Sequence, residues 1–357
     1  MGPGAEGYDT EAPLDEYYYS RERLEVMRKI QESSLDVPFA SDELPGLVAA
    51  LTERMELTSP SLIPHLGMLE GKTYAELFGA ALGVISADRQ PTAEPGWLGF
   101  NENWAVEFFA PLARSFLDAR FIVIVRDVRA SVASQRALED PALVALTMSF
   151  VRCWRKMIAF ARHYQGLALF DGRLRVVRYE ELVAEPEETA RGLCKFLDVD
   201  FAPEMLDTGN FAGRGDSTWT PNSSFEVPAR GIYTDSLERW RKMLPPDMVH
   251  LIELAAGPDL EFAGYALSEP SDGGIPWDAY RCHIREHAEC RGWRTDREDP
   301  AADFALELLR RRCLGDFVED DAIVEECFLF RDVYQDMRDG QQLSSTPGGK
   351  MGVRGGS

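Results

Sequence analysis

The segment from Phe121 to Arg126 constrains the fold more than any other part of the sequence. Its first five residues, FIVIV, are all apolar, and four of them are β-branched. An unbroken run of this kind is typical of a strand that is buried on both faces, as parallel strands are beneath covering helices. The run stops at Arg126, and a helical pattern follows directly. We therefore expect a parallel sheet with helices packed on it.

Other segments repeat this alternation of strand and helix. RLRVVRY, residues 173–179, is a second strand candidate, and WLGF, residues 97–100, is a weaker third. Because a helical pattern follows each of them, the order predicts an α/β fold, a parallel sheet flanked by helices. A long helix from about residue 140 to 163 has the apolar spacing of a helix that buries one face. Pro186 and Thr73 are expected at the starts of two further helices.

Length and charge limit the classes of partner. The chain has 357 residues, 38 of them basic and 60 acidic, which gives a net charge of −22. A surface of this charge repels polyanions, so we expect no nucleic acid and no membrane as partner. Six scattered cysteines and an N-terminus without an apolar leader predict free thiols and a cytoplasmic location. The sequence leaves the oligomeric state open.

The end of the first strand is the expected position of a local anion site. In open α/β sheets, ligands bind at the carboxyl ends of the strands. Arg126 holds that position, its guanidinium suits a phosphate, and a helix N-terminus follows. Ser134 can reach the same anion only if the intervening segment is part loop and part helix. The alternative is that Arg126 pairs with an acid such as Asp127 and that Ser134 lies on a helix surface.

Several motifs resemble the sulfotransferases that use 3′-phosphoadenosine 5′-phosphosulfate. They are RDVRASVASQ, RVVRYEELVAEPEETARGLCKFLDVDF, NSSF and RGIYTDSLERWRKML, in the family's order within roughly residues 97–267. The resemblance implies a sheet with the topology of P-loop nucleotide kinases. It also implies transfer of a sulfuryl group from this donor to a hydroxyl or amine of a small-molecule acceptor, with adenosine 3′,5′-bisphosphate as the product.

The resemblance also implies roles for single residues. Arg126 and Ser134 correspond to the pair that binds the 3′-phosphate, and Tyr179 corresponds to the tyrosine near the adenine. Arg230-Gly231 resembles the loop that closes over the same phosphate, although the family's lysine between them is missing. Judged without the resemblance, Tyr179 is a strand-end tyrosine and Arg230 is a solvated loop residue.

Two parts of the family pattern are absent or uncertain. The Gly-rich loop with a Lys or Arg that binds the phosphosulfate is not found within residues 1–96. The nearest stretch, Gly67 to Thr73, has three residues between its glycines where a Walker loop needs four, so we expect a turn before a helix. Glu102 is the candidate catalytic base, if burial raises its pKa. Alternatively, it lies in the first turn of a helix that a neighbouring asparagine caps.

The remaining segments are predicted from composition and spacing. Within RCHIREHAEC, His283, His287 and Cys290 lie on one helical face, but three ligands on one short helix make a poor zinc site, so no metal is expected. Trp154 and Trp240 are assigned to packing. The predicted order is a disordered N-terminus, an α/β domain, a helical extension and a disordered tail, at residues 1–16, 17–267, 268–339 and 340–357.

Two alternatives to an active transferase remain. One is an inactive relative that binds a nucleotide or a partner protein through the same scaffold, because the phosphosulfate loop is not found. The other is a P-loop kinase or NTPase, which would depend on Lys72.

Overall fold

The structure, a computed structural model, describes part of the chain. The described residues are 21–58, 60–89, 96–101, 105–136, 147–208, 232, 234–268, 300–315 and 321–343. They divide into two compact units, one containing residues 25–119 and the other containing residues 21–24 and 120–343. The predicted domain boundaries at residues 16, 267 and 339 stay predictions.

The first unit is helical and has its own apolar core. Its elements are α1 (Arg21–Glu32) from residue 25 onward, α2 (Leu44–Thr58), the 3-10 helix η1 (Pro60–Met68), α3 (Tyr74–Arg89), η2 (Ala105–Phe108) and α4 (Phe109–Ser115). Leu66, Leu77 and Val84 are buried in the core that α2, η1 and α3 share. The Thr73 hydroxyl accepts the Glu76 N–H at 3.2 Å and so caps α3. The expectation of a turn before a capped helix is therefore confirmed.

The strand expected at residues 97–100 is not formed. Residues 96–101 are described and contain no strand. The side chains of Trp97, Leu98 and Phe100 are 41–51% exposed, although the Phe100 ring lies 5.6 Å from the ring of Phe78. Two glycines in this segment weaken its preference for an extended ladder, because glycine has no side chain to pack against a neighbouring strand.

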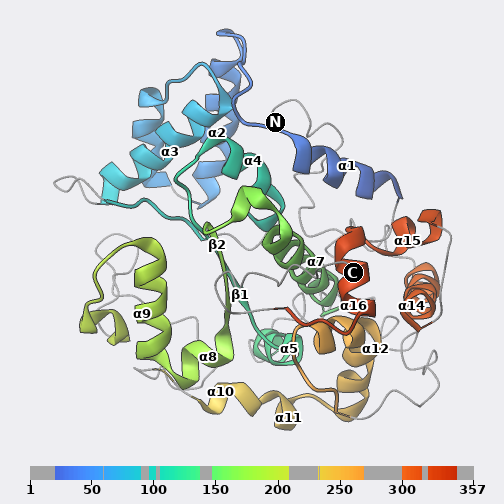
Figure 1. Cartoon of the computed structure of the whole chain (residues 1–357). Coiled ribbons are helices and arrows are strands. Elements are labelled where there is room, and N and C mark those ends of the chain that lie inside the picture. Colours follow the sequence, from blue (N-terminus) through green and yellow to red (C-terminus); the bar gives the residue numbers. More distant parts are fainter. Residues whose placement is uncertain are drawn as a thin grey trace, which may run out of the picture. The chain divides into compact units, whose positions relative to one another are not determined.

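The second unit contains the sheet. Strands β1 (Phe121–Val125) and β2 (Leu174–Arg178) run parallel and pair in register, from Phe121 with Leu174 to Val125 with Arg178. Each strand is followed by a helix, α5 (Val128–Arg136) after β1 and α8 (Tyr179–Ala184) after β2. Figure 1 shows α7 (Thr147–Gly166) and α9 (Pro186–Leu197) on opposite sides of the strands. The predicted α/β class, with a parallel sheet flanked by helices, is confirmed, and the sheet has two strands within the described residues.

Helix α7 lies at the centre of the second unit. It packs against β2, α5, α12 (Pro246–Phe262) and α16 (Arg331–Arg338). The prediction that it buries a single face is wrong for its described side chains. Arg152 and Arg155 are only 3% and 1% exposed, because acidic residues on other helices pair with the charge of Arg155 inside the unit.

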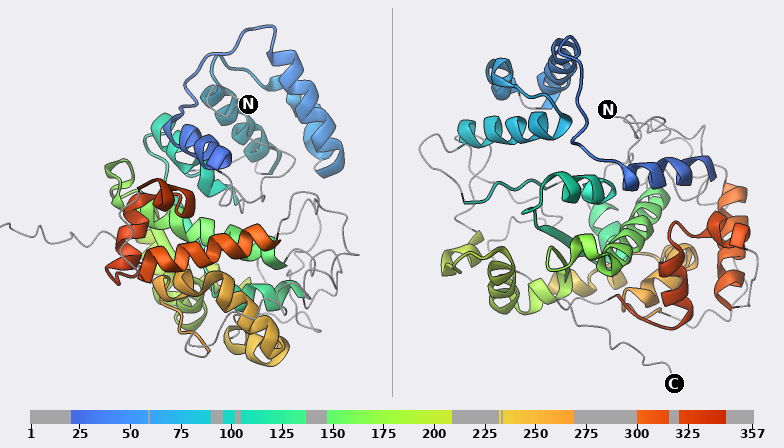
Figure 2. Two further views of the ribbon diagram at one scale, coloured as in Figure 1. Left: turned by 90° about the vertical axis from the view of Figure 1, so that its right-hand side faces the viewer. Right: turned by 45° about the horizontal axis from the view of Figure 1, so that its top comes forward.

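The remaining elements of this unit are short helical turns and the helices near the C-terminus. They are η3 (Ala168–Phe170), η4 (Pro203–Leu206), α10 (Asp235–Glu238), α11 (Trp240–Met243), α14 (Pro300–Gly315) and α15 (Asp321–Cys327). Figure 2 shows α14 beside α12. In the part of the chain that the structure describes, no helix is both long enough and apolar enough to cross a membrane.

Buried ion pairs tie α14 to α7 and α12. The Asp259 carboxylate of α12 accepts a hydrogen bond from Arg310 of α14 at 2.8 Å and lies 3.3 Å from Arg155 Nε of α7. Glu307 of α14 lies 3.1 Å from the Arg155 guanidinium. All four side chains are at most 6% exposed. The C-terminal helix α14 therefore contributes charges to the interior of the second unit.

Candidate functional site

The carboxyl ends of the two strands bring Arg126 and Tyr179 together. Each residue directly follows the last pair in the register, Val125 with Arg178. The Arg126 guanidinium carbon lies 4.3 Å from the centroid of the Tyr179 ring, a cation–π contact. Both side chains also reach Ser236 of α10, where Arg126 Nη2 donates to the backbone oxygen at 3.3 Å and the Tyr179 hydroxyl lies 3.4 Å from the Ser236 hydroxyl.

The guanidinium of Arg126 is still able to bind a further acceptor. Its Nε is buried and has no hydrogen-bond partner among the described residues. A buried donor without a partner costs free energy, which an anionic ligand at this position would recover. The alternative expectation, an ion pair between Arg126 and Asp127, is not what the structure shows, because the Asp127 carboxylate binds Arg129. The residues at the strand ends therefore fit a phosphate group.

Ser134 lies on the helix that begins beside this arginine. Arg126 and Asp127 precede α5, which starts at Val128, so the segment is part loop and part helix, as a shared anion would require. Ser134 is half-buried and lies about 9 Å along the helix axis from Val128. A joint contact of Arg126 and Ser134 with one phosphate stays a prediction.

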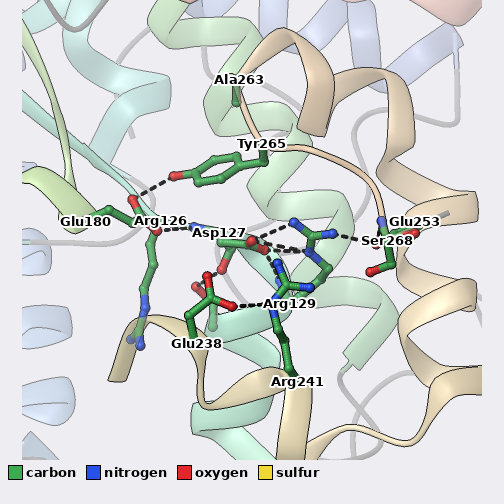
Figure 3. A network of polar contacts seen from close by, with 12 residues as sticks. Arg126, Asp127, Arg129, Glu180, Glu238, Arg241, Glu253, Ala263, Tyr265 and Ser268 are labelled. Atoms are coloured by element: carbon green, nitrogen blue, oxygen red, sulfur yellow. Dashed lines mark hydrogen bonds and ion pairs between the residues drawn. The ribbon is translucent and has the colours of Figure 1, made fainter. Parts of the chain in front are cut away.

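An internal ion-pair network lies next to the strand end. The Arg129 guanidinium, 2% exposed, binds Asp127 at 2.7 Å and Glu253 of α12, and stacks on the Trp240 ring at 4.3 Å. Burial opposes the charge of Arg129, but the two carboxylates outweigh it and raise its pKa. In Figure 3 the Arg126 side chain points away from this network. Of these two arginines, Arg126 is therefore the one available to a ligand.

Side chains that the sequence did not reveal hold the backbone of the site. Asp127 caps α5 by accepting the Arg129 N–H at 2.8 Å. The Glu180 carboxylate accepts the Asp127 N–H at 3.0 Å, and the Trp154 indole donates to the Arg126 carbonyl at 2.8 Å. The assignment of Trp154 to packing is thus incomplete. The sequence signal that could have revealed this cap is an Asp two residues before an Arg at a strand end. No signal in the sequence indicates that Trp154 and Glu180 bind the backbone here.

Several predicted site residues lie outside the described residues. These are Glu102, Arg230 and Gly231, and the helical face with His283, His287 and Cys290. Their roles stay predictions. Among the described residues, no group of three His, Cys, Asp or Glu side chains is placed to hold a metal ion.

The stretch Gly67 to Thr73 does not have the geometry of a phosphate-binding loop. Gly67 belongs to η1 rather than to a loop after a strand, and Lys72 is exposed. The Thr73 hydroxyl is engaged at the start of α3. A nucleotide kinase built on this stretch is therefore not supported by the structure.

Known proteins that resemble this chain are sulfotransferases. Human carbohydrate sulfotransferase 3 is 27% identical over 188 residues, covering 46% of this chain and 37% of that protein. The protein-tyrosine sulfotransferase of Drosophila melanogaster is 29% identical over 170 residues, covering 45% of this chain and 33% of that protein. The matches thus span about a third of the length of these relatives.

A solved structure and a family model also match. The sulfotransferase domain from the curacin biosynthetic pathway is 21% identical, with a TM-score of 0.38, and the match covers 62% of this chain and 78% of that one. Residues 73–203 match the model of the sulfotransferase family, and this segment includes β1, β2, Arg126 and Tyr179. The family model and these relatives support a sulfotransferase family member, at low identity.

Proposed function

We propose that the protein transfers a sulfuryl group from 3′-phosphoadenosine 5′-phosphosulfate to a hydroxyl or amine of a small acceptor. The observation that carries this proposal is Arg126, which follows β1 with a buried Nε that has no partner among the described residues and a guanidinium stacked on Tyr179. The match of residues 73–203 to the sulfotransferase family model supports the reaction class. When bound, the nucleotide supplies the activated sulfuryl group.

The chain's own residues would bind and orient the nucleotide. Arg126 and Ser134 would hold the 3′-phosphate, and Tyr179 would lie near the adenine. The Tyr179 ring already supports the guanidinium, so Arg126 needs little rearrangement to meet the anion. Arg230 and Gly231 would close over the same phosphate, and Glu102 would accept the proton of the attacking group.

The acceptor is proposed from chemistry and from the relatives. The relatives above are named for carbohydrate and protein-tyrosine acceptors, which both carry hydroxyl groups. The net charge of −22 disfavours polyanionic acceptors by long-range repulsion. A small, uncharged hydroxyl compound is thus the first class to test, with a tyrosine peptide and a neutral oligosaccharide as comparisons.

Calorimetric binding of adenosine 3′,5′-bisphosphate tests the nucleotide site. We expect the wild type to bind and Arg126→Ala to lose about 1.5 to 3 kcal/mol, the value of a charge-assisted hydrogen bond. Arg191→Ala is the matched control, because this exposed arginine of α9 pairs with Glu187 on the surface. Equal binding by wild type and Arg126→Ala, or no binding by either, would overturn the proposal.

A second function, nucleotide binding without transfer, is favoured by one observation. Within the described residues the sheet has only two strands, and none precedes α3 where the family's phosphosulfate loop would lie. Mass spectrometry of acceptors incubated with the donor separates the two functions. A sulfated product that disappears in Glu102→Gln supports transfer, whereas tight nucleotide binding without product from any acceptor class supports the second function.

A further inference from the structure

Two side chains bind the peptide unit that joins Arg126 to Asp127. The Arg126 carbonyl and the Asp127 N–H belong to the same planar group, so fixing both fixes the plane. The carbonyl accepts the Trp154 indole N–H at 2.8 Å, and the N–H donates to Glu180 Oε1 at 3.0 Å. Trp154 comes from α7 and Glu180 from α8. Two separate helices thus set the orientation of one peptide at the carboxyl end of β1.

Tyr265 completes a ring of contacts around this peptide. Its hydroxyl donates to Glu180 Oε2 at 3.0 Å, and its ring centroid lies 6.4 Å from that of Trp154. Burial, together with the negative charge of Glu180, raises the pKa of Tyr265, so its hydroxyl stays a donor at neutral pH. Figure 3 shows Glu180 lying between Asp127 and Tyr265. Each Glu180 oxygen therefore accepts a hydrogen bond from the chain itself, which fixes the carboxylate beside the peptide.

The fixed peptide determines where the Arg126 side chain starts. A rotation of this peptide would change φ of Asp127 and ψ of Arg126, the residue whose guanidinium lies on the Tyr179 ring. Preorganised donors bind an anion better because they lose little conformational freedom on binding. The bonds to Trp154 and Glu180 engage only the backbone of this peptide, so the Nε of Arg126 keeps its free donor.

We propose that Trp154 and Glu180 are positioning residues, which hold the Arg126–Asp127 peptide so that Arg126 meets the 3′-phosphate of the nucleotide. This inference rests on the proposed function, since it presumes that Arg126 binds that phosphate. The competing explanation is that the two hydrogen bonds stabilise the fold alone. The two explanations differ in which part of the nucleotide's affinity they affect.

The test compares two nucleotides that differ only in the 3′-phosphate. The ratio of the Kd of adenosine 5′-phosphate to that of adenosine 3′,5′-bisphosphate isolates the contribution of this group, because a general loss of folded protein weakens both nucleotides equally. We expect Trp154→Phe and Glu180→Ala each to lower this ratio about fivefold, the value of one hydrogen bond. Glu180→Gln should keep the ratio within about twofold, because its amide can accept the Asp127 N–H and donate to Tyr265.

Glu181→Ala is the matched control. It removes the neighbouring carboxylate of α8, an exposed one, so it repeats the change in net charge without touching the peptide. The ratio should stay at its wild-type value. In the Arg126→Ala background, Glu180→Ala should have no further effect on the ratio, because the group that it positions is gone.

Hydrogen exchange of the Asp127 amide gives a readout that is independent of nucleotide binding. We expect this amide to exchange at least about fivefold faster in Glu180→Ala than in the wild type, at equal global stability. Unchanged ratios in Trp154→Phe and Glu180→Ala would overturn the positioning role even if exchange accelerates. If the wild type binds neither nucleotide, the proposed function fails and the positioning role fails with it. If the wild type binds and only the ratios stay unchanged, the positioning role alone fails.

Discussion

Replacing Asp259 by asparagine should strongly destabilise the second unit. Asp259 is 2% exposed and faces two buried guanidiniums, Arg310 at 2.8 Å and Arg155 at 3.3 Å. The substitution keeps the shape of the side chain but removes one of the negative charges that balance them. Removing one partner of a buried ion pair costs about 3–5 kcal/mol, because the remaining charge stays desolvated. Asparagine retains an acceptor oxygen, so we expect a loss of about 3 kcal/mol.

Urea denaturation, followed by tryptophan fluorescence and circular dichroism, measures this loss. Since the chain has two compact units, the two signals need not report one transition, and the comparison applies to the transition that Trp154 and Trp240 of the second unit report. Glu187→Gln is the matched control, because its carboxylate pairs with Arg191 on the surface, where both side chains are more than half exposed. We expect the control to change stability by no more than about 0.5 kcal/mol.

Salt separates the buried pair from a surface effect. Added sodium chloride screens exposed charges, whereas buried pairs are screened much less. The difference between wild type and Asp259→Asn should therefore persist at about 1 M salt, where the Debye length is about 3 Å. A loss below about 1 kcal/mol at low salt, or a loss that salt abolishes, would refute the reasoning that these charges are desolvated and mutually dependent.

Three further predictions follow from single contacts. Burial opposes ionisation of Asp332, but the hydrogen bond to His163 outweighs burial and lowers the pKa of Asp332. Asp332→Asn should therefore destabilise the protein at pH 6, and the destabilisation should disappear as the pH falls below about 4. Denaturation at several pH values measures this difference in stability. Gly264→Ala should cost about 1 kcal/mol or more in urea denaturation, because φ is +81° and the new Cβ would lie 2.6 Å from the Arg178 guanidinium. Burial raises the pKa of Cys327 to about 12, so native iodoacetamide labelling at pH 8, mapped by mass spectrometry, should leave this thiol unmodified until the protein is unfolded.

Local patterns predicted the elements that depend on local chemistry. The bounds of β1 match the apolar run Phe121–Val125, because a strand buried between helices needs an unbroken series of apolar side chains. The starts of α3 and α9 follow from Thr73 and Pro186, which act within one helical turn. The proximity of Arg126 and Tyr179 also follows, since the ends of adjacent parallel strands lie at one edge of the sheet.

The features that sequence could not predict depend on partners far along the chain. Burial of Arg155 in α7 requires Asp259 and Glu307, which are more than 100 residues away in the sequence. The local sequence of α7 alone therefore predicts an amphipathic helix. The same holds for Trp154, whose indole N–H binds a backbone carbonyl that has no sequence signature. The segment at residues 97–100 was misjudged for a related reason, because a strand exists only where a neighbouring strand pairs with it.

Helix α7 connects the candidate site to the C-terminal helices. Trp154 and Arg155 are consecutive and therefore point about 100° apart around the helix axis. One binds the peptide after β1, and the other lies among the acids of α12 and α14. A change that removes α14 would take Glu307 from Arg155 and Arg310 from Asp259, and so would disrupt the buried charges that pack against α7 next to the residue that holds Arg126. The C-terminal helices should therefore affect nucleotide binding without contacting the nucleotide, through the stability of α7 alone.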